Sequence, residues 1–106
     1  MNLTVHPLDL GTLNVDKSGL TLRRGVGTRV DAPCLGYLIK GSAEPILVDS
    51  GPCADPEWGT RHHNPFRRSS EQSLARALER HGVVPQAIKT VIVSHLHWDH
   101  CYGNAL

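Results

Sequence analysis

Short apolar runs separated by turn residues dominate the first half of this 106-residue chain. Residues 3–15 alternate imperfectly between apolar and polar positions, because Pro7 and Gly11 interrupt the pattern. This pattern predicts one or two short strands joined by a turn. The following stretch, residues 16–33, is rich in glycine and arginine and predicts a loop whose basic side chains face solvent.

A β-hairpin is the clearest prediction in the middle of the chain. Residues 34–40 and 45–49 are strand-like, and a Gly-Ser-Ala-Glu turn at 41–44 separates them. The Ser-Gly-Pro sequence at 50–52 ends the second strand. The polar segment 51–70 contains several prolines and predicts a long loop, of the kind that often binds or covers a ligand.

A helix followed by a buried strand is predicted next. Ser69 and Gln72 have the spacing of a capping box, and Gly82 stands where a helix would end. Four residues between them share one helical face: Leu74, Ala77, Leu78 and His81. Residues 85–88 predict one further turn. Residues 90–94 are almost continuously apolar and predict a strand buried on both faces, as in the centre of a sheet.

The order strand, strand, loop, helix, strand is typical of an α/β fold. The length suits one domain, and 40% of the residues are hydrophobic. A net charge of +1 predicts neither nucleic acid nor a membrane as a partner. The N-terminus lacks the layout of a signal peptide, so we expect a cytoplasmic protein. The three cysteines are too scattered for a disulfide framework, and we expect reduced thiols.

Candidate chemistry gathers in one motif near the end of the chain. It reads Ser94-His95-Leu96-His97-Trp98-Asp99-His100. In an extended segment the side chains at positions i and i+2 point the same way. His95 and His97 should therefore converge, while Leu96 and Trp98 turn towards the interior.

The end of the motif should extend the same site. A bend into a helical turn through Cys101 and Tyr102 would allow Asp99 and His100 to reach a second point nearby. Imidazole and carboxylate ligands suit zinc, and iron or manganese also accept them. Two such ions about 3.5–4 Å apart could share a hydroxide.

This motif resembles the His-x-His-x-Asp-His motif of the metallo-β-lactamase superfamily. Residues 46–51, Ile-Leu-Val-Asp-Ser-Gly, are similar to the strand of that family that ends in Asp-Thr-Gly or a close variant. The resemblance covers most of residues 34–103. The opening at 8–13 and the ending at 101–104 look most like N-acyl-homoserine-lactone lactonases.

The resemblance implies a role for each motif residue. His95 and His97 would bind a first zinc ion, and Asp99 and His100 would bind a second. Asp99 would also be catalytic, managing protons at the attacking water. Two further residues, Asp49 and Ser94, would orient the metal-binding loop by hydrogen bonds, unless Asp49 only shapes its turn. The implied reaction is attack of a zinc-bound hydroxide on an ester or lactone carbonyl of a small molecule.

The implied fold is the N-terminal half of an αββα sandwich, a mixed sheet with a flanking helix. In the family a further His, a bridging Asp or Cys and a last His follow the motif, whereas only residues 101–106 follow it here. We therefore expect residues 1–106 to be a partial domain, truncated after the motif. We expect the isolated chain to fold poorly, to bind at most one zinc weakly and not to hydrolyse lactones.

A different class of function stays open from the sequence. The chain could be a non-catalytic metal-binding or assembly module that is completed by a partner chain or in a swapped homodimer, whereas the hydrolase interpretation implies a missing C-terminal half. In the 51–70 loop, Trp58 and Phe66 either contact substrate or pack the loop against the domain. We expect His81 to pack at the helix end, and His62 and His63 to be solvated or to face substrate.

Overall fold

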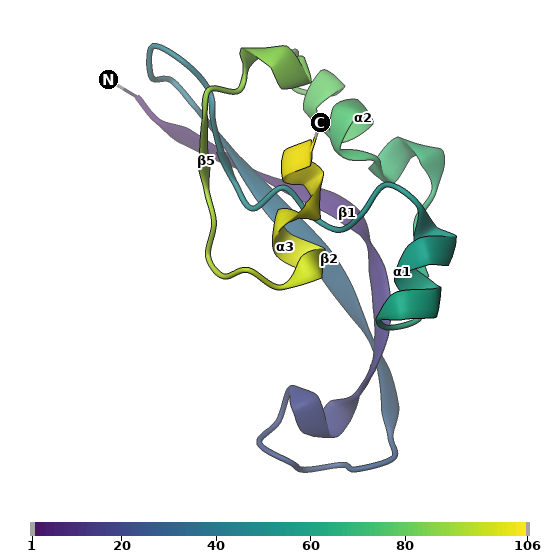
Figure 1. Cartoon of the computed structure of the whole chain (residues 1–106). Coiled ribbons are helices and arrows are strands. Elements are labelled where there is room, and N and C mark those ends of the chain that lie inside the picture. Colours follow the sequence, from purple (N-terminus) through teal and green to yellow (C-terminus); the bar gives the residue numbers. More distant parts are fainter. Residues whose placement is uncertain (1, 106) are drawn as a thin grey trace.

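A five-stranded mixed sheet carries helices around it in the computed structural model, which describes residues 2–105 (Figure 1). The strand order is β4-β1-β2-β3-β5. The strands are β1 (Thr4–Asp16), β2 (Arg29–Lys40), β3 (Ile46–Val48), β4 (Phe66–Arg67) and β5 (Thr90–Ile92). The helices are α1 (Pro56–His62), α2 (Leu74–Glu79) and α3 (Trp98–Cys101). Among the described residues, no helix is long and apolar enough to cross a membrane.

The long β1–β2 hairpin differs from the two short strands and loop predicted for this region. The two strands pair antiparallel from Thr4 opposite Lys40 to Asp16 opposite Arg29. A register irregularity near Gly11, whose φ is +130°, replaces the expected break. The prediction of a loop through residue 33 was therefore wrong from Arg29 onwards, because cross-strand pairing overrides the weak local pattern.

The predicted loop 51–70 was also wrong, because it contains helix α1 and strand β4. The Asp55 carboxylate accepts a hydrogen bond from the backbone N–H of Glu57 at 3.0 Å and so caps α1. Pro56 occupies the first turn, where its missing N–H costs nothing. The Asp-Pro pair was the sequence signal for this helix. Strand β4 lies beyond it and pairs with β1 through Phe66 and Leu13.

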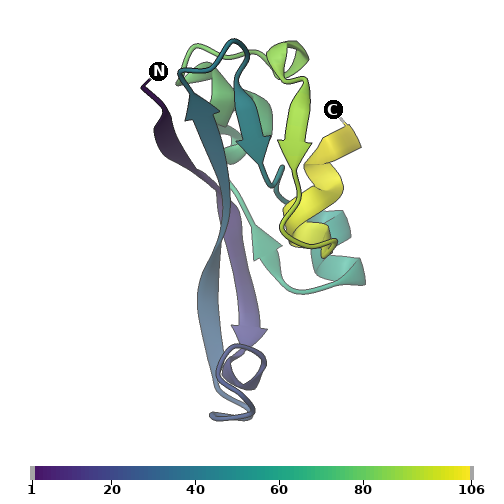
Figure 2. The same cartoon turned by 90° about the vertical axis from the view of Figure 1, so that its left-hand side faces the viewer.

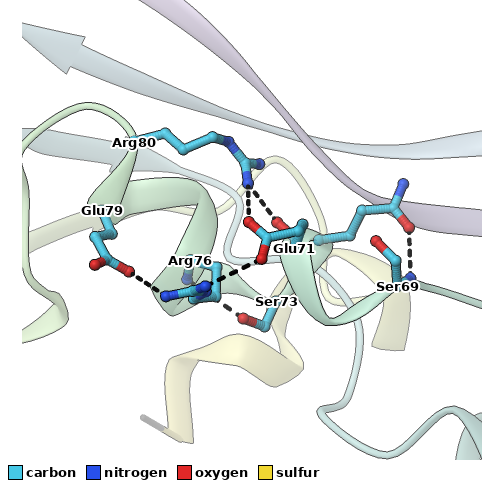
Figure 3. Close-up of polar contacts among 7 residues, drawn as sticks. Ser69, Glu71, Ser73, Arg76, Glu79 and Arg80 are labelled. Atoms are coloured by element: carbon cyan, nitrogen blue, oxygen red, sulfur yellow. Dashed lines mark hydrogen bonds and ion pairs between the residues drawn. The ribbon is translucent and has the colours of Figure 1, made fainter.

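The predicted helix is present but starts later than Ser69. The Ser69 N–H donates to Gln72 Oε1 at 2.9 Å, as the capping-box spacing predicted, yet this pair bounds only a 3-10 turn (Figure 3). Helix α2 has its own cap, because the Arg76 N–H donates to Ser73 Oγ. Ion pairs among four exposed side chains then cover the solvent side of the helix: Glu71, Arg76, Glu79 and Arg80.

The core lies between the sheet and α2. Its most deeply buried large side chains are Leu10, Leu38, Leu47 and Leu78. The predicted apolar face of the helix contributes Leu74, Ala77 and Leu78 to it. In Figure 2, the green ribbon of α2 lies behind the strands. The predicted turn at 85–88 is confirmed as a 3-10 turn.

Strand β5 is not the buried central strand that the sequence predicted. It pairs in parallel with β3 and forms one edge of the sheet. Val91 and Ile92 are 37% and 50% exposed. An apolar strand at an edge with exposed side chains is a site where another segment can pair or pack. The apolar run therefore reflects a surface that the described residues leave uncovered.

Candidate metal centre

The motif leaves the sheet at the end of β5 and turns into α3. Backbone hydrogen bonds tie both ends of it to the segment that follows β3. The Asp49 N–H donates to Ile92 O at 2.8 Å, and the Ser50 N–H donates to His100 O at 2.9 Å. The Gly103 N–H donates to Gly51 O at 3.2 Å. Residues 49–51 therefore form a backbone floor on which the motif is mounted.

The Asp49 side chain connects this floor to two residues of the motif. Its carboxylate accepts hydrogen bonds from the Ser94 N–H at 2.8 Å and from the Ser94 hydroxyl at 2.6 Å. The same carboxylate lies 2.9 Å from Nδ1 of His100. Burial raises the pKa of Asp49, but the hydrogen bonds from Ser94 and His100 outweigh it and leave the pKa below its usual value. Asp49 is 5% exposed, so it is a buried carboxylate that links two motif residues.

The backbone of Asp49 is also unusual. Its φ of +59° lies in the left-handed region, which is uncommon for residues other than glycine. Asp and Asn adopt it more readily than most residues. Such strain is kept where the surrounding contacts determine the conformation, and here it aims the carboxylate at Ser94 and His100.

The imidazoles of the motif lie close together. The ring centroids of His95 and His97 are 4.7 Å apart, and those of His95 and His100 are 4.0 Å apart. His100 Nε2 lies 3.4 Å from Oδ2 of Asp99. The predicted convergence of the two first histidines and the predicted helical turn after them are both present.

The two apolar residues of the motif behave differently. Trp98 is 9% exposed and turns inward as predicted, but Leu96 is 81% exposed, so its predicted inward orientation was wrong. The reason is that β5 ends at Ile92, and residues 93–97 do not keep the two-residue alternation of a strand.

The donor set fits a metal ion in kind. Three imidazoles and one carboxylate come from a six-residue stretch, and imidazole with carboxylate is a ligand set that zinc accepts. Within residues 2–105, no three such donors converge on a single point. His95 and His97 are exposed, and Nδ1 of His95 lies 3.0 Å from the Ser94 hydroxyl, whereas His100 is oriented by the buried Asp49.

Cys34 is a buried residue of the hydrophobic core. Burial, followed by the charge of Asp99, raises the pKa of its thiol to about 12. Cys34 therefore packs as a small apolar side chain. All three cysteines are free, as predicted.

The two aromatic residues proposed for substrate contact lie in different places. Phe66 is 6% exposed and meets Trp98 edge-on at 5.6 Å, so it packs in the core because β4 pairs with β1. Trp58 is half-buried, and its ring lies 5.7 Å from that of Tyr102. Phe66 therefore packs this segment against the domain, which is one of the two roles considered from the sequence. Trp58 lies at the partly exposed surface of α1.

A groove of about 470 Å³ runs beside the motif. Its apolar wall comes from the β1–β2 hairpin, and its polar end holds motif residues together with a histidine and an asparagine from the end of α1. The lining residues are Leu13, Val15, Leu20, Ala32, Pro33, His63, Asn64, His97, Trp98, Asp99 and His100. The candidate ligands therefore border an open, largely apolar groove.

The sequence did not single out this groove. The ring of His63 stacks on that of Trp98, with centroids 4.7 Å apart and planes 11° apart. Only the two-residue spacing of Leu13 and Val15, which places them on one face of a strand, could have indicated the apolar wall. His81 lies elsewhere, against His6 at a ring distance of 4.8 Å.

The two neighbouring arginines after β4 have structural partners. Arg67 forms an exposed ion pair with Asp31 at 3.0 Å. The Arg68 guanidinium donates to Leu10 O at 2.8 Å and to Cys53 O at 3.3 Å. Both side chains therefore have contacts within the fold.

A sequence profile described as "Metallo-beta-lactamase superfamily" matches residues 29–106, and the chain belongs to this superfamily. Its similar relatives are bacterial lactonases. An N-acyl homoserine lactonase of Bacillus cereus is 30% identical to it over 105 residues, and N-acyl homoserine lactonase AiiB of Agrobacterium fabrum is 32% identical over 110 residues. A crystal structure of a B. thuringiensis AiiA mutant, with N-decanoyl-L-homoserine bound at its active site, superimposes with a TM-score of 0.84 at 25% identity.

These similarities extend over most of this chain but over less than half of the relatives. The two lactonase alignments cover 89% and 88% of the chain, and 41% and 40% of the relatives. The structural match covers 99% of the chain and 46% of the AiiA mutant. The resemblance to the N-terminal part of a metallo-β-lactamase fold is thereby confirmed, with its mixed sheet and flanking helices. Membership in this superfamily also implies a metal cofactor.

Proposed function

We propose that this chain supplies the metal-binding part of a zinc-dependent hydrolase that opens lactones of the N-acyl homoserine type. One observation carries the proposal: the ring centroid of His95 lies 4.7 Å from that of His97 and 4.0 Å from that of His100, and the Asp49 carboxylate orients His100. The similarity to lactonases supports the substrate class.

Each motif residue has a place in the proposed chemistry. His95 and His97 would hold one zinc ion, and Asp99 and His100 would hold a second. Zinc, when bound, supplies Lewis acidity and lowers the pKa of a bound water to about 7. The hydrogen bond of His100 Nδ1 to Asp49 leaves Nε2 of the same ring available as a ligand atom. The Asp99 carboxylate would accept the proton of the attacking water.

The groove beside the motif would receive the acyl part of the substrate. Its apolar wall, which includes Leu13, Val15 and Pro33, is chemically suited to an alkyl chain. The opposite end of the groove holds Asp99 and His100, where the lactone carbonyl would lie. A substrate with an apolar tail and a polar, hydrolysable head matches this division of the groove.

The experiment joins residues 1–106 to the remaining C-terminal part of the B. cereus lactonase and measures zinc-dependent hydrolysis of N-hexanoyl-homoserine lactone. The proposal predicts turnover by this chimera. It also predicts that His97→Ala and Asp99→Ala reduce kcat/KM at least about 100-fold, since each removes a metal ligand. The isolated chain is expected to show no turnover. A folded, zinc-loaded chimera with no more activity than its His97→Ala variant would contradict the proposal.

A second candidate function is a non-catalytic metal-binding module that is completed by a partner chain. The exposed edge strand β5, with Val91 and Ile92 open to solvent, favours it, because another strand or helix could cover that edge. It predicts zinc-dependent dimerisation of the isolated chain, which analytical ultracentrifugation with and without zinc would detect. An active chimera together with a chain that stays monomeric in zinc would contradict this second candidate.

A further inference from the structure

The far end of the β1–β2 hairpin, residues 17–28, is named here the hairpin tip. Figures 1 and 2 both show it projecting from the rest of the molecule. Three of its large apolar side chains face solvent: Leu20 is 60% exposed, Leu22 93% and Val26 76%. Exposed apolar residues are common singly, but three within seven positions at a protruding end form a local apolar surface.

The hairpin tip is also basic. It contains Lys17, Arg23 and Arg24 and no acidic residue, so its charge is +3, whereas the whole chain carries only +1. All three basic side chains are exposed. Within residues 2–105, none of them takes part in an ion pair. The charge averaged over the chain, on which the expectation of no membrane partner rested, conceals this local excess.

Polar contacts, rather than apolar packing, fold the hairpin tip. The Asp16 carboxylate at its base accepts hydrogen bonds from the N–H groups of Ser18 and Gly27, each at 2.9 Å. The Lys17 N–H donates to Thr28 O at 2.8 Å and closes the base. The tip is thus ordered without burying its large apolar side chains. Leu20 also borders the groove beside the motif, which leaves Leu22 and Val26 as the apolar side chains most available to a partner.

The backbone at the end of the tip is strained. Leu22 and Arg23 have φ values of +50° and +63°, in the left-handed region that non-glycine residues rarely adopt. Two consecutive residues in this region cost free energy. These two residues, one apolar and one basic, are both exposed.

We propose that the hairpin tip is a docking surface for an anionic lipid bilayer. Basic residues are attracted to the negative surface of such a bilayer, while exposed apolar side chains enter the boundary between headgroups and acyl chains. Both kinds of residue are present on one small, ordered projection. A second copy of the chain does not fit, because two tips of charge +3 repel each other. This proposal does not depend on the hydrolase function.

The test measures co-sedimentation of the 106-residue chain with vesicles of phosphatidylcholine alone and of phosphatidylcholine with 30% phosphatidylglycerol. We expect binding to the anionic vesicles that weakens with salt and is much weaker on phosphatidylcholine alone. Each basic residue near the surface contributes about fivefold to the partition coefficient. Arg23→Ser with Arg24→Ser should therefore lower it about 25-fold. Leu22→Ser should lower it at least about fivefold.

A control variant removes one exposed arginine and one exposed apolar residue outside the tip, Arg61→Ser with Val84→Ser. It should bind anionic vesicles like the unmodified chain, and circular dichroism should show that every variant is folded. Equal binding by the tip variants and the control would overturn the proposal. So would the absence of binding to anionic vesicles. Self-association that the tip variants abolish, without vesicle binding, would instead identify a second copy as the occupant.

Discussion

The two ends of the motif are held in different ways. At the end that enters α3, His100 is bonded to the buried Asp49 carboxylate and Trp98 is inserted into the core. At the end that leaves β5, Ser94 is bonded to Asp49, but the three residues that follow it, His95, Leu96 and His97, are exposed. We call residues 98–100 the anchored end and residues 95–97 the free end. We infer that folding fixes the side chains of the anchored end, while those of the free end gain further contacts when a metal or a covering segment is present.

The largest difference in the free energy of unfolding is expected between substitutions of the two apolar residues of the motif. Trp98→Ala at the anchored end should lower the free energy of unfolding by about 3–5 kcal/mol, because it removes a buried ring that contacts His63 and Phe66. Leu96→Ala at the free end should change it by less than about 0.5 kcal/mol. Urea unfolding followed by circular dichroism measures both. Similar losses for the two variants would remove the distinction between the ends.

The next effect concerns the Asp49 carboxylate. Asp49→Ala should cost about 2–3 kcal/mol, because the N–H of Ser94 and the ring nitrogen of His100 lose a charged, buried partner. Since folding lowers the pKa of Asp49, its contribution is fully present above the pKa of the unfolded carboxyl. That contribution is lost as the pH falls through the pKa of the folded protein.

The matched control for Asp49→Ala is Asp31→Ala, which removes an exposed ion pair with Arg67 and should change stability little. The stability difference between the unmodified chain and Asp49→Ala should narrow in acid. Urea unfolding at several pH values follows this difference. A constant difference between pH 3 and pH 7 would show that the carboxylate charge does not stabilise the anchored end.

A smaller effect on stability is expected from a substitution at Gly36, which packs against the backbone of Asp49. A Cβ on Gly36 would lie 2.6 Å from Asp49 O and 3.1 Å from Leu10 Cδ1. Gly36→Ala should therefore cost about 1–3 kcal/mol through overpacking. Gly19→Ala is the control, since within residues 2–105 nothing apart from its own chain neighbours lies within 4 Å of its Cβ position. The midpoints of thermal unfolding of the two variants should differ. Equal midpoints would mean that Gly36 is loosely packed against the backbone of Asp49.

The smallest effect on stability is expected at the free end. His95→Ala should leave the metal-free stability within about 0.5 kcal/mol, because the ring is exposed. His100→Ala should lower it measurably, because the ring is bonded to Asp49. Both variants should weaken zinc binding. If His95→Ala destabilised the metal-free chain as much as His100→Ala, the free end would be as firmly held as the anchored end.

The sequence predicted the features that depend on local pattern. The β-hairpin around residues 41–44, the apolar face of α2 and the helical turn at the end of the motif all follow from spacing and turn residues. The predictions from the sequence were wrong where contacts between distant residues determine the structure. The length of β1 depends on pairing with β2, and the exposure of β5 depends on what covers the sheet.

Candidate site residues were predictable only in part. The motif indicated the donors, and the bonds between Asp49 and Ser94 are those expected for an orienting residue. The left-handed backbone of Asp49 and the stacking of His63 on Trp98 were not foreseeable, because neither leaves a pattern along the chain. The inward turn predicted for Leu96 failed because the strand ends before the motif begins.

The central claim is that the motif is a metal centre whose orientation Asp49 sets, and zinc titration against a competing chelator tests it most directly. The unmodified chain should bind zinc. Affinity should fall about 10–100-fold in Asp49→Ala, which removes an orienting partner, and further in His97→Ala, which removes a ligand. Asp31→Ala should bind like the unmodified chain. Zinc affinity that is unchanged in both Asp49→Ala and His97→Ala would contradict the account.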